Sequence, residues 1–254
     1  MQSKVVKSRD FISRPILDVE NLLESTNLIW VSTSASLQIE VLMNLSHVKN
    51  KTIIIEKPIC SDKYLNEKLQ EFFLNNSNIK ISRPWNFSDI WINFKNEIKS
   101  KDKIKNINVE HFGPILRPYL YPPQDWLHHD LCLIQDLGIN LHAAEFSASA
   151  TWSKNNQTLR IAGNDKIPLV ITGGYLKERK SRFTIEYFDK TKVELDLNKK
   201  LYSIRRAGHI SKSNHFKQDG SIITMVEYFS ESINDVKNHA IELGYLRNLG
   251  ILQN

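Results

Sequence analysis

The sequence predicts an α/β domain with a parallel sheet, followed by an α+β domain whose open, mainly antiparallel sheet is covered by helices on one face. Through the first third of the chain, short apolar runs alternate with helical patterns, which is the order of βαβ units. Beyond Arg83 the strand patterns are longer, and apolar residues recur at every second position. We therefore expect residues 1–83 to form the first domain and residues 84–254 the second.

The first domain is predicted to contain short strands separated by helices. The strands are apolar runs, rich in β-branched residues, at 5–6, 28–33, 53–55 and 79–82. Helical patterns occupy 19–23 after Asp18, 36–47, and a segment after Asp62 that places Leu65 and Leu69 on one face. Because the strands contain few polar residues, we expect a parallel sheet covered on both faces.

The second domain begins with a predicted helix at 85–98 and a strand at 107–112. A helix at 126–137 follows a proline-rich loop and ends at Gly138, a natural C-cap. Strand patterns then occupy 144–153, 158–162, 169–172, 183–188 and 192–197, and the last two form a predicted hairpin with matching apolar faces. A helical segment at 222–249 closes the chain, with an expected break near Gly244. We expect a homo-oligomer formed through the uncovered face of the sheet, since Tyr187 and Phe188 lie on opposite sides of their strand.

Composition excludes several classes of function. No run approaches the roughly 18 apolar residues of a membrane span, and the first ten residues lack the apolar core of a signal peptide. We therefore expect a cytoplasmic protein without a membrane partner. The net charge of +6 is spread along the chain, and no DNA-reading motif or aromatic platform accompanies it, so no nucleic-acid partner is expected.

The two cysteines, Cys60 and Cys132, lie far apart and outside any CxxC pattern. They provide neither a disulfide framework nor a zinc ribbon, and we expect both to be small buried hydrophobic residues. A metal site that combines them with His128 and His129 is an alternative, but it depends on an unproven proximity of Cys60 to the other three. No metal site is predicted.

The run of isoleucines at 53–55 ends abruptly in Glu56, Lys57 and Pro58. Pro58 cannot donate a hydrogen bond to a sheet and holds Lys57 in an extended conformation, so the strand must end there. Ligands of open α/β sheets bind at this carboxyl edge. An acid and a base at such a place are costly to bury unless they are paired or used.

Asp125 and His129 are four residues apart and lie on one face if Asp125 opens the predicted helix. Cys132 and Asp136 continue the same stripe. Each residue also has a simpler interpretation: Asp125 as an N-cap, His129 as a satisfied or exposed histidine, and Lys57 as a surface lysine. The chemistry therefore depends on whether Lys57, Asp125 and His129 act together.

These motifs resemble the Gfo/Idh/MocA oxidoreductases, the family of glucose-fructose oxidoreductase and inositol dehydrogenase. The resemblance rests on "IWVSTSASLQIEVL", "EKPICSD", "DWLHHDLCLIQDLG" and the closing "MVEYFSESI". The family has a Thr-Pro turn with a histidine four residues beyond the proline, then Glu-Lys-Pro, and later D-x-x-x-H-[DE]. Glu-Lys-Pro matches fully, and Asp125, His129 and Asp130 match the later motif, whereas Ser34 and Gln38 replace the proline and the histidine.

The resemblance implies a Rossmann-like first domain and an NAD- or NADP-dependent oxidoreductase. Its substrate would be the hydroxyl of a sugar, sugar nucleotide or cyclitol. In the implied mechanism, His129 accepts the hydroxyl proton, Lys57 stabilises charge on the reacting oxygen and Asp125 orients His129. These three residues should meet in a cleft between the domains, with Lys57 within about 10 Å of the His129 ring. Cofactor contacts are implied at Thr33, Ser34, Gln38, Glu56 and Lys57.

A dinucleotide pyrophosphate needs a glycine-rich turn between the first strand and the first helix. The first of the nine glycines here is Gly113. Residues 5–10 resemble the second strand of the family, so we expect its first strand, glycine loop and first helix, roughly 25 to 30 residues, to be missing. Two interpretations follow. One is an enzyme with an incomplete or degenerate cofactor site, and the other is a non-catalytic sugar-binding, regulatory or oligomerising relative.

Overall fold

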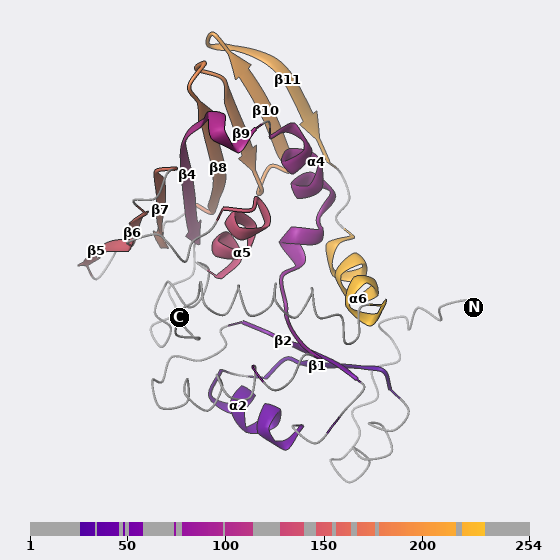
Figure 1. The fold of residues 1–254 in the computed structure, drawn as a ribbon. Helices are drawn as coiled ribbons and strands as arrows, with labels where there is room; N and C mark the ends of the chain where they lie inside the picture. Colours follow the sequence, from indigo (N-terminus) through magenta and orange to yellow (C-terminus); the bar gives the residue numbers. More distant parts are fainter. Residues whose placement is uncertain are drawn as a thin grey trace.

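The computed structural model describes residues 26–33, 35–45, 48, 51–57, 74, 78–98, 100–113, 128–139, 146–153, 156–163, 167–175, 178–216 and 220–231. They form a three-stranded sheet and an eight-stranded sheet, each with its own helices (Figure 1). The predicted fold class is confirmed. The elements predicted at 5–6, at 19–23 and after Asp62 lie outside the described residues.

The first sheet is parallel and has the order β1-β2-β3. Its strands are β1 (Leu28–Val31), β2 (Thr52–Ile55) and β3 (Ile79–Ile81). Every residue of the central strand β2 is buried, as its run of stiff isoleucines predicted. All three residues of β3 are buried as well, including Lys80.

Two helices from distant parts of the chain accompany this sheet. Helix α2 (Ala35–Asn44) follows β1, close to the predicted range, and α6 (Ser221–Glu231) belongs to the predicted closing helix, whose remainder lies outside the described residues. Met225 and Phe229 of α6 pack against Ile54 in a buried cluster. In Figure 1, α6 lies above β1 and β2, and α2 lies below them. Helix α6, far along the chain from β2, therefore helps to cover the first sheet.

The segment that leaves β3 consists of two helices, so the single helix predicted at 85–98 was wrong. A 3-10 helix, η3 (Pro84–Phe87), comes first, and α4 (Asp89–Glu97) follows. The break falls at Ser88, which is extended (φ −76°, ψ 139°). Its hydroxyl accepts the backbone N–H of Trp91 and so caps a new helix.

The second sheet has eight strands in the order β11-β10-β9-β8-β4-β7-β6-β5. Strand β4 pairs with β7 in parallel, and the other neighbouring pairs are antiparallel. Its strands are β4 (Ile104–Gly113), β5 (Phe146–Ser153), β6 (Asn156–Gly163), β7 (Leu169–Tyr175), β8 (Lys180–Tyr187), β9 (Lys192–Asp196), β10 (Leu201–Arg206) and β11 (His209–His215), and a short 3-10 helix, η4 (Lys101–Lys103), precedes β4. The predicted β8–β9 hairpin is confirmed, with Phe183 opposite Leu195 and Ile185 opposite Val193.

The sequence analysis missed the β10–β11 hairpin. All residues of β11 are exposed, so it has no apolar alternation. The available signal was the two-residue connection Ala207-Gly208, where both φ angles are positive (49° and 84°), as in the type I′ turns that join hairpin strands.

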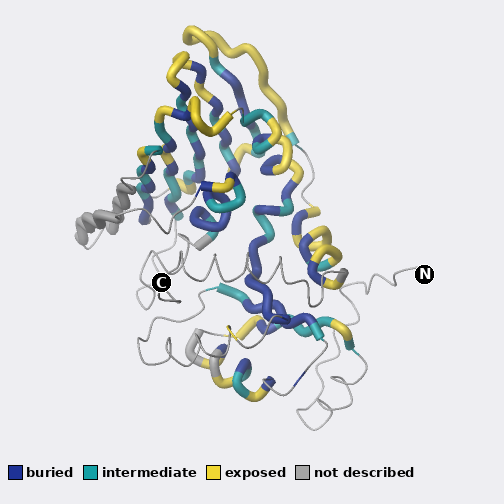
Figure 2. Tube along the Cα trace, viewed as in Figure 1, coloured by how far each residue is buried: buried dark blue, intermediate teal, exposed yellow. Residues whose placement is uncertain are grey.

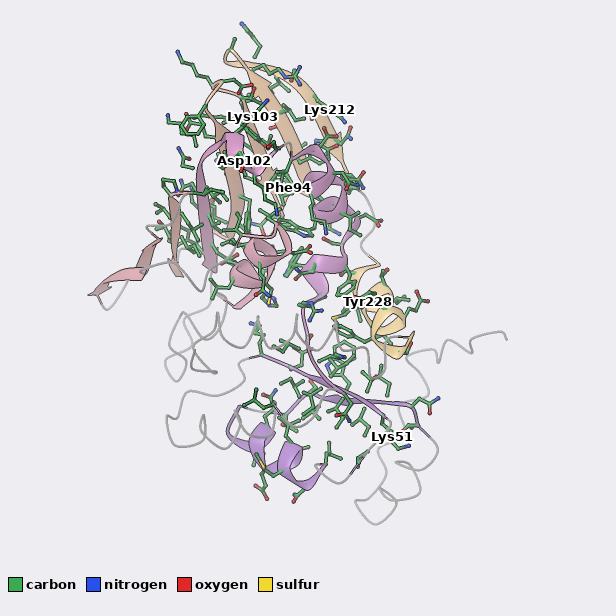
Figure 3. All side chains as sticks on the ribbon, viewed as in Figure 1. Lys51, Phe94, Asp102, Lys103, Lys212 and Tyr228 are labelled. Carbon is green, nitrogen blue, oxygen red and sulfur yellow. The ribbon has the colours of Figure 1, made fainter. Side chains whose placement is uncertain are left out.

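Helices α4 and α5 (His128–Asp136) cover one face of the second sheet, and the core lies between them and the strands. The largest buried members include Trp91, Phe94, Phe183 and Tyr202. Figure 2 shows buried positions alternating with partly exposed ones along β8, and Figure 3 marks Phe94 beside the strands.

The other face of β8 carries Arg182, Thr184 and Glu186, so it is polar. Phe188, expected to be apolar surface on that face, instead follows the end of β8 in the hairpin turn and is 69% exposed. The apolar argument for self-association was therefore wrong. Self-association itself stays a prediction.

Candidate active site

Glu56 directly follows β2 at the carboxyl edge of the parallel sheet. Its Oε1 atom accepts hydrogen bonds from Nε1 of Trp30 (3.0 Å) and from Oγ of Ser82 (2.8 Å). Trp30 belongs to β1, and Ser82 directly follows β3. The Glu56 carboxylate is therefore hydrogen-bonded to a residue of β1 and to the residue after β3, the two strands that flank β2. These bonds stabilise the charged group that the sequence places at the end of an apolar strand.

Gln38 of α2 also contacts Glu56, through the backbone. Its side chain is fully buried, and Nε2 donates to the backbone carbonyl of Glu56 at 2.6 Å. Its Oε1 atom is buried and has no hydrogen-bond partner among the described residues. Gln38 thus fixes the end of β2, and its predicted contact with a cofactor stays a prediction.

Lys57 and Thr33 occupy the same edge. Lys57 is half-buried directly after Glu56, and Thr33 is exposed two residues after β1. Because β1 and β2 are parallel, the residues that follow them meet at one edge of the sheet, where ligands of such sheets bind. Ser34 and Asp125 lie outside the described residues.

Helix α5 carries His129 in its first turn. The helix ends as predicted at Gly138, whose φ of +72° suits the residue after a C-cap. His129 is half-buried, and its Nδ1 atom is among the buried atoms. At the other end of the stripe, Asp136 accepts from Nε1 of Trp91 (2.7 Å) and Nζ of Lys95 (3.1 Å). The C-terminal half of α5 is therefore attached to α4.

A histidine that the sequence analysis did not single out lies beside Asp130. The Nδ1 atom of His111 is 3.1 Å and 3.2 Å from the two carboxylate oxygens of Asp130, which is 1% exposed. Asp130 matched the family motif without an assigned role. The available signal for His111 was its place two residues after Val109, on the apolar face of the predicted strand.

Residues 82–86 connect the two halves of the site. Ser82 binds Glu56, and four residues later Nδ2 of Asn86 donates to the carbonyl of Cys132 at 3.1 Å. Cys132 lies three residues after His129, about one helical turn along α5. This short segment therefore contacts both the carboxyl edge of the first sheet and the helix that carries His129.

The structure also bears on the cysteine and metal predictions. Cys132 is buried, as expected, whereas Cys60 lies outside the described residues. Within the described part of the chain, no group of three or more His, Cys, Asp or Glu side chains is placed to hold a metal ion. The helices described there are all too short or too polar to cross a membrane.

No protein-family model matches the sequence, and no curated protein matches it. Solved structures do share the fold. A dehydrogenase (MviM) from Clostridium difficile has a TM-score of 0.72 at 14% identity, covering 91% of this chain and 80% of its own. UDP-N-acetylglucosamine 3-dehydrogenase GnnA from Acidithiobacillus ferrooxidans has a TM-score of 0.71 at 15% identity, with 92% and 81% covered.

A third similar structure is a variant of KijD10, a 3-ketoreductase from Actinomadura kijaniata, in complex with TDP-benzene and NADP. Its TM-score is 0.69 at 10% identity, and the match covers 92% of this chain and 79% of that chain. At these identities the similarity concerns the fold. This chain therefore has the fold of dehydrogenases and of a ketoreductase.

Proposed function

We propose that this chain is an NAD(P)-dependent oxidoreductase that moves a hydride between the cofactor and the carbinol carbon of a sugar, sugar nucleotide or cyclitol. The observation that carries the proposal is the arrangement at the end of β2. The carboxylate of Glu56 is engaged by Trp30 and Ser82, and the next residue is Lys57 at the ligand-binding edge. The shared fold with dehydrogenases supports the same assignment.

Oxidation of a carbinol removes the hydroxyl proton and a hydride from the carbon that bears it. In the proposed roles, His129 accepts the proton, since an imidazole titrates near neutral pH. The ammonium of Lys57 donates a hydrogen bond to the reacting oxygen and stabilises its developing negative charge. Asp125 orients His129. When bound, the nicotinamide supplies the redox step by accepting the hydride.

The contacts of residues 82–86 support a common site for Lys57 and His129. The segment holds the carboxylate next to Lys57 through Ser82, and it holds α5 one turn from His129 through Asn86. Contacts to both elements through one short segment favour a constant spacing between the end of β2 and the first turn of α5. Preorganisation of this kind is what hydride transfer requires of its protein.

The carboxyl edge fits the nicotinamide end of a dinucleotide. An exposed Thr33, a fixed Glu56 and the half-buried Lys57 offer a hydroxyl, a carboxylate and an ammonium there, and Ser34 and Gln38 are the further proposed contacts. The pyrophosphate is a separate matter, because no glycine precedes Gly113 in the sequence. NAD or NADP is therefore the proposed cofactor, and its affinity for this chain should be low.

The deciding experiment is a turnover screen at millimolar dinucleotide. The purified 254-residue chain is incubated with NAD or NADP and a panel of free sugars, UDP- and TDP-sugars and cyclitols, and reduced cofactor is followed by its absorbance. Turnover that Lys57→Ala abolishes supports the proposal. Sugar binding by calorimetry without turnover supports the alternative of a non-catalytic sugar-binding relative, and a chain that neither binds nor turns over any member of the panel overturns both.

A further inference from the structure

We infer that His111 and Asp130 form a positioning pair, which holds the first turn of α5 against β4 and thereby fixes the placement of His129. The role of His129 as a base rests on the proposed function. The placement itself does not, because it follows from the contacts of α5. His111 and Asp130 are therefore assigned as positioning residues, with no direct contact with substrate implied.

The geometry of the pair is that of a ring nitrogen facing a carboxylate. Both oxygens of Asp130 lie 3.1 Å to 3.2 Å from Nδ1 of His111. A carboxylate only accepts hydrogen bonds, so the proton between them resides on Nδ1 of His111. Asp130 is 1% exposed and His111 is 15% exposed. A carboxylate so deeply buried requires this partner, because the solvation it has lost must be replaced.

Among the described residues, the polar contacts of α5 go to different elements at its two ends. Near the middle of the helix, the carbonyl of Cys132 accepts from Asn86, and at the end Asp136 binds Trp91 and Lys95. These contacts attach the helix to η3 and α4. Asp130 instead reaches across to the sheet, from the position next to His129.

The consequence of losing the pair is local to the first turn. The rest of α5 is anchored by the buried residues Leu131, Leu133 and Ile134, and by the attachment of Asp136. Without a donor from His111, Asp130 would turn toward water and carry the backbone of its neighbour His129 with it. A displacement of about 1 Å of a reacting group can lower a rate about a hundredfold.

The test compares two substitutions of one residue. His111→Leu removes the donor, whereas His111→Asn retains an amide N–H close to the position of Nδ1 and should restore the contact with Asp130. Asp136→Asn serves as the control, since it weakens the attachment at the other end of the same helix. All three variants are made in the full 254-residue chain.

The first readout is the Cε1–Hε1 NMR signal of His129, assigned with a His129→Gln variant. We expect the signal to shift in His111→Leu and to return to its original position in His111→Asn. Asp136→Asn should leave it in place even where the variant lowers Tm. If His111→Leu lowers Tm and leaves the signal unmoved, or if His111→Asn moves it as far as His111→Leu does, the pair is merely structural and the inference is overturned.

The second readout applies once a substrate is identified. His111→Leu should then lower kcat about tenfold to a hundredfold with little change in KM for the dinucleotide, and His111→Asn should recover most of the loss. A normal kcat in His111→Leu overturns the inference. The NMR readout needs no turnover, so failure of the proposed function and failure of the positioning role are distinguished.

Discussion

Trp30 and Glu56 are joined across neighbouring strands by a hydrogen bond of 3.0 Å from the indole Nε1 to the carboxylate Oε1. A second hydrogen bond, from Ser82 after β3, holds the Glu56 carboxylate at the carboxyl edge of the first sheet. The next residue, Lys57, therefore follows a side chain that is hydrogen-bonded to Trp30 and to Ser82, on the two sides of β2.

Replacement of Trp30 by Phe should lower the free energy of unfolding by about 1 kcal/mol, because it removes one donor from a charged acceptor that is partly exposed. The replacement also reduces the two fused rings of the indole to one, so a control that loses the same ring is needed. Urea denaturation measures the loss. Trp85→Phe is the control, because it makes the same chemical change in a partly buried tryptophan that packs against the core of the second sheet. Equal losses in both variants would show that ring size and not the bond to Glu56 matters.

Replacement of Lys57 by Ala should lower kcat by about a hundredfold to a thousandfold, the effect of removing one donor to a developing negative charge. The matched control is Lys51→Ala. Lys51 lies just before β2, at its amino end, and donates to the carbonyl of Thr26 at 2.6 Å; Figure 3 labels it beside the first sheet. We expect that variant to retain kcat. Similar activity losses in the two variants would contradict the assigned role of Lys57.

Dinucleotide binding to this chain should be weak, with a Kd above about 1 mM for both NADH and NADPH. Several charge-assisted hydrogen bonds from a glycine-rich turn, each worth about 1.5 to 3 kcal/mol, are lost where no such turn is available, and this shifts a micromolar site beyond millimolar. Fluorescence titration of the purified chain measures the Kd. A micromolar value would reveal a phosphate site built without glycine.

Stability toward acid should depend in part on Glu97. The hydrogen bond from Lys212 holds the pKa of Glu97 below its ordinary value of 4.5, against an opposing effect of burial, and a further hydrogen bond from Tyr202 adds to the lowering. Because the folded-state pKa is lower, this contribution is present above pH 4.5 and is lost as the pH falls through the folded-state value. Figure 3 shows Lys212 at the edge of the second sheet beside α4.

Glu97→Gln should therefore lower Tm at pH 7, and the difference from the original chain should shrink as the pH is lowered below 4.5. Thermal unfolding followed by circular dichroism at several pH values measures both quantities. Asp102→Asn changes an exposed carboxylate and should show neither effect. A Tm difference for Glu97→Gln that stays constant down to about pH 3 would exclude this linkage.

Self-association through the face of the second sheet opposite α4 and α5 should be sensitive to salt. The face carries ion pairs between Arg182 and Asp196 (3.9 Å) and between Arg205 and Glu194 (2.7 Å). Light scattering at micromolar protein should show dimers or larger species at about 0.05 M salt and fewer of them at about 0.5 M, as the Debye length shortens. Arg182→Glu should weaken the association, whereas Lys190→Glu in the exposed β8–β9 turn should not. A monomer at every salt concentration would refute the prediction.

The sequence predicted those elements whose pattern is enforced by burial. The isoleucines of β2 and the matched apolar faces of β8 and β9 are buried from water. Such burial leaves a visible pattern in the sequence, as a continuous apolar run in β2 and as alternate apolar residues in β8 and β9. The β10–β11 hairpin was missed for the opposite reason. Its outer strand is exposed throughout, so nothing but the Ala207-Gly208 turn marks it.

The candidate site was predictable only in part. Lys57 and His129 could be proposed from the sequence because a strand end and a helical spacing are local patterns. The hydrogen bond from Trp30 to Glu56 could not be predicted, because it joins residues 26 positions apart. His111 was missed because its meaning depends on Asp130, which a different element brings to it. Pairings between elements are set by the packing of the whole chain, and one sequence does not record them.

The hydroxyl of Thr52 at the start of β2 donates to the carbonyl of Phe229 in α6, 177 residues later. Met225 and Phe229 cover Ile54 of the same strand. During synthesis, the face of the first sheet that α6 covers can therefore be buried only after residue 229 has left the ribosome. Its apolar strands stay open to chaperones and to aggregation throughout translation of the second sheet, and contacts of such separation make folding slow.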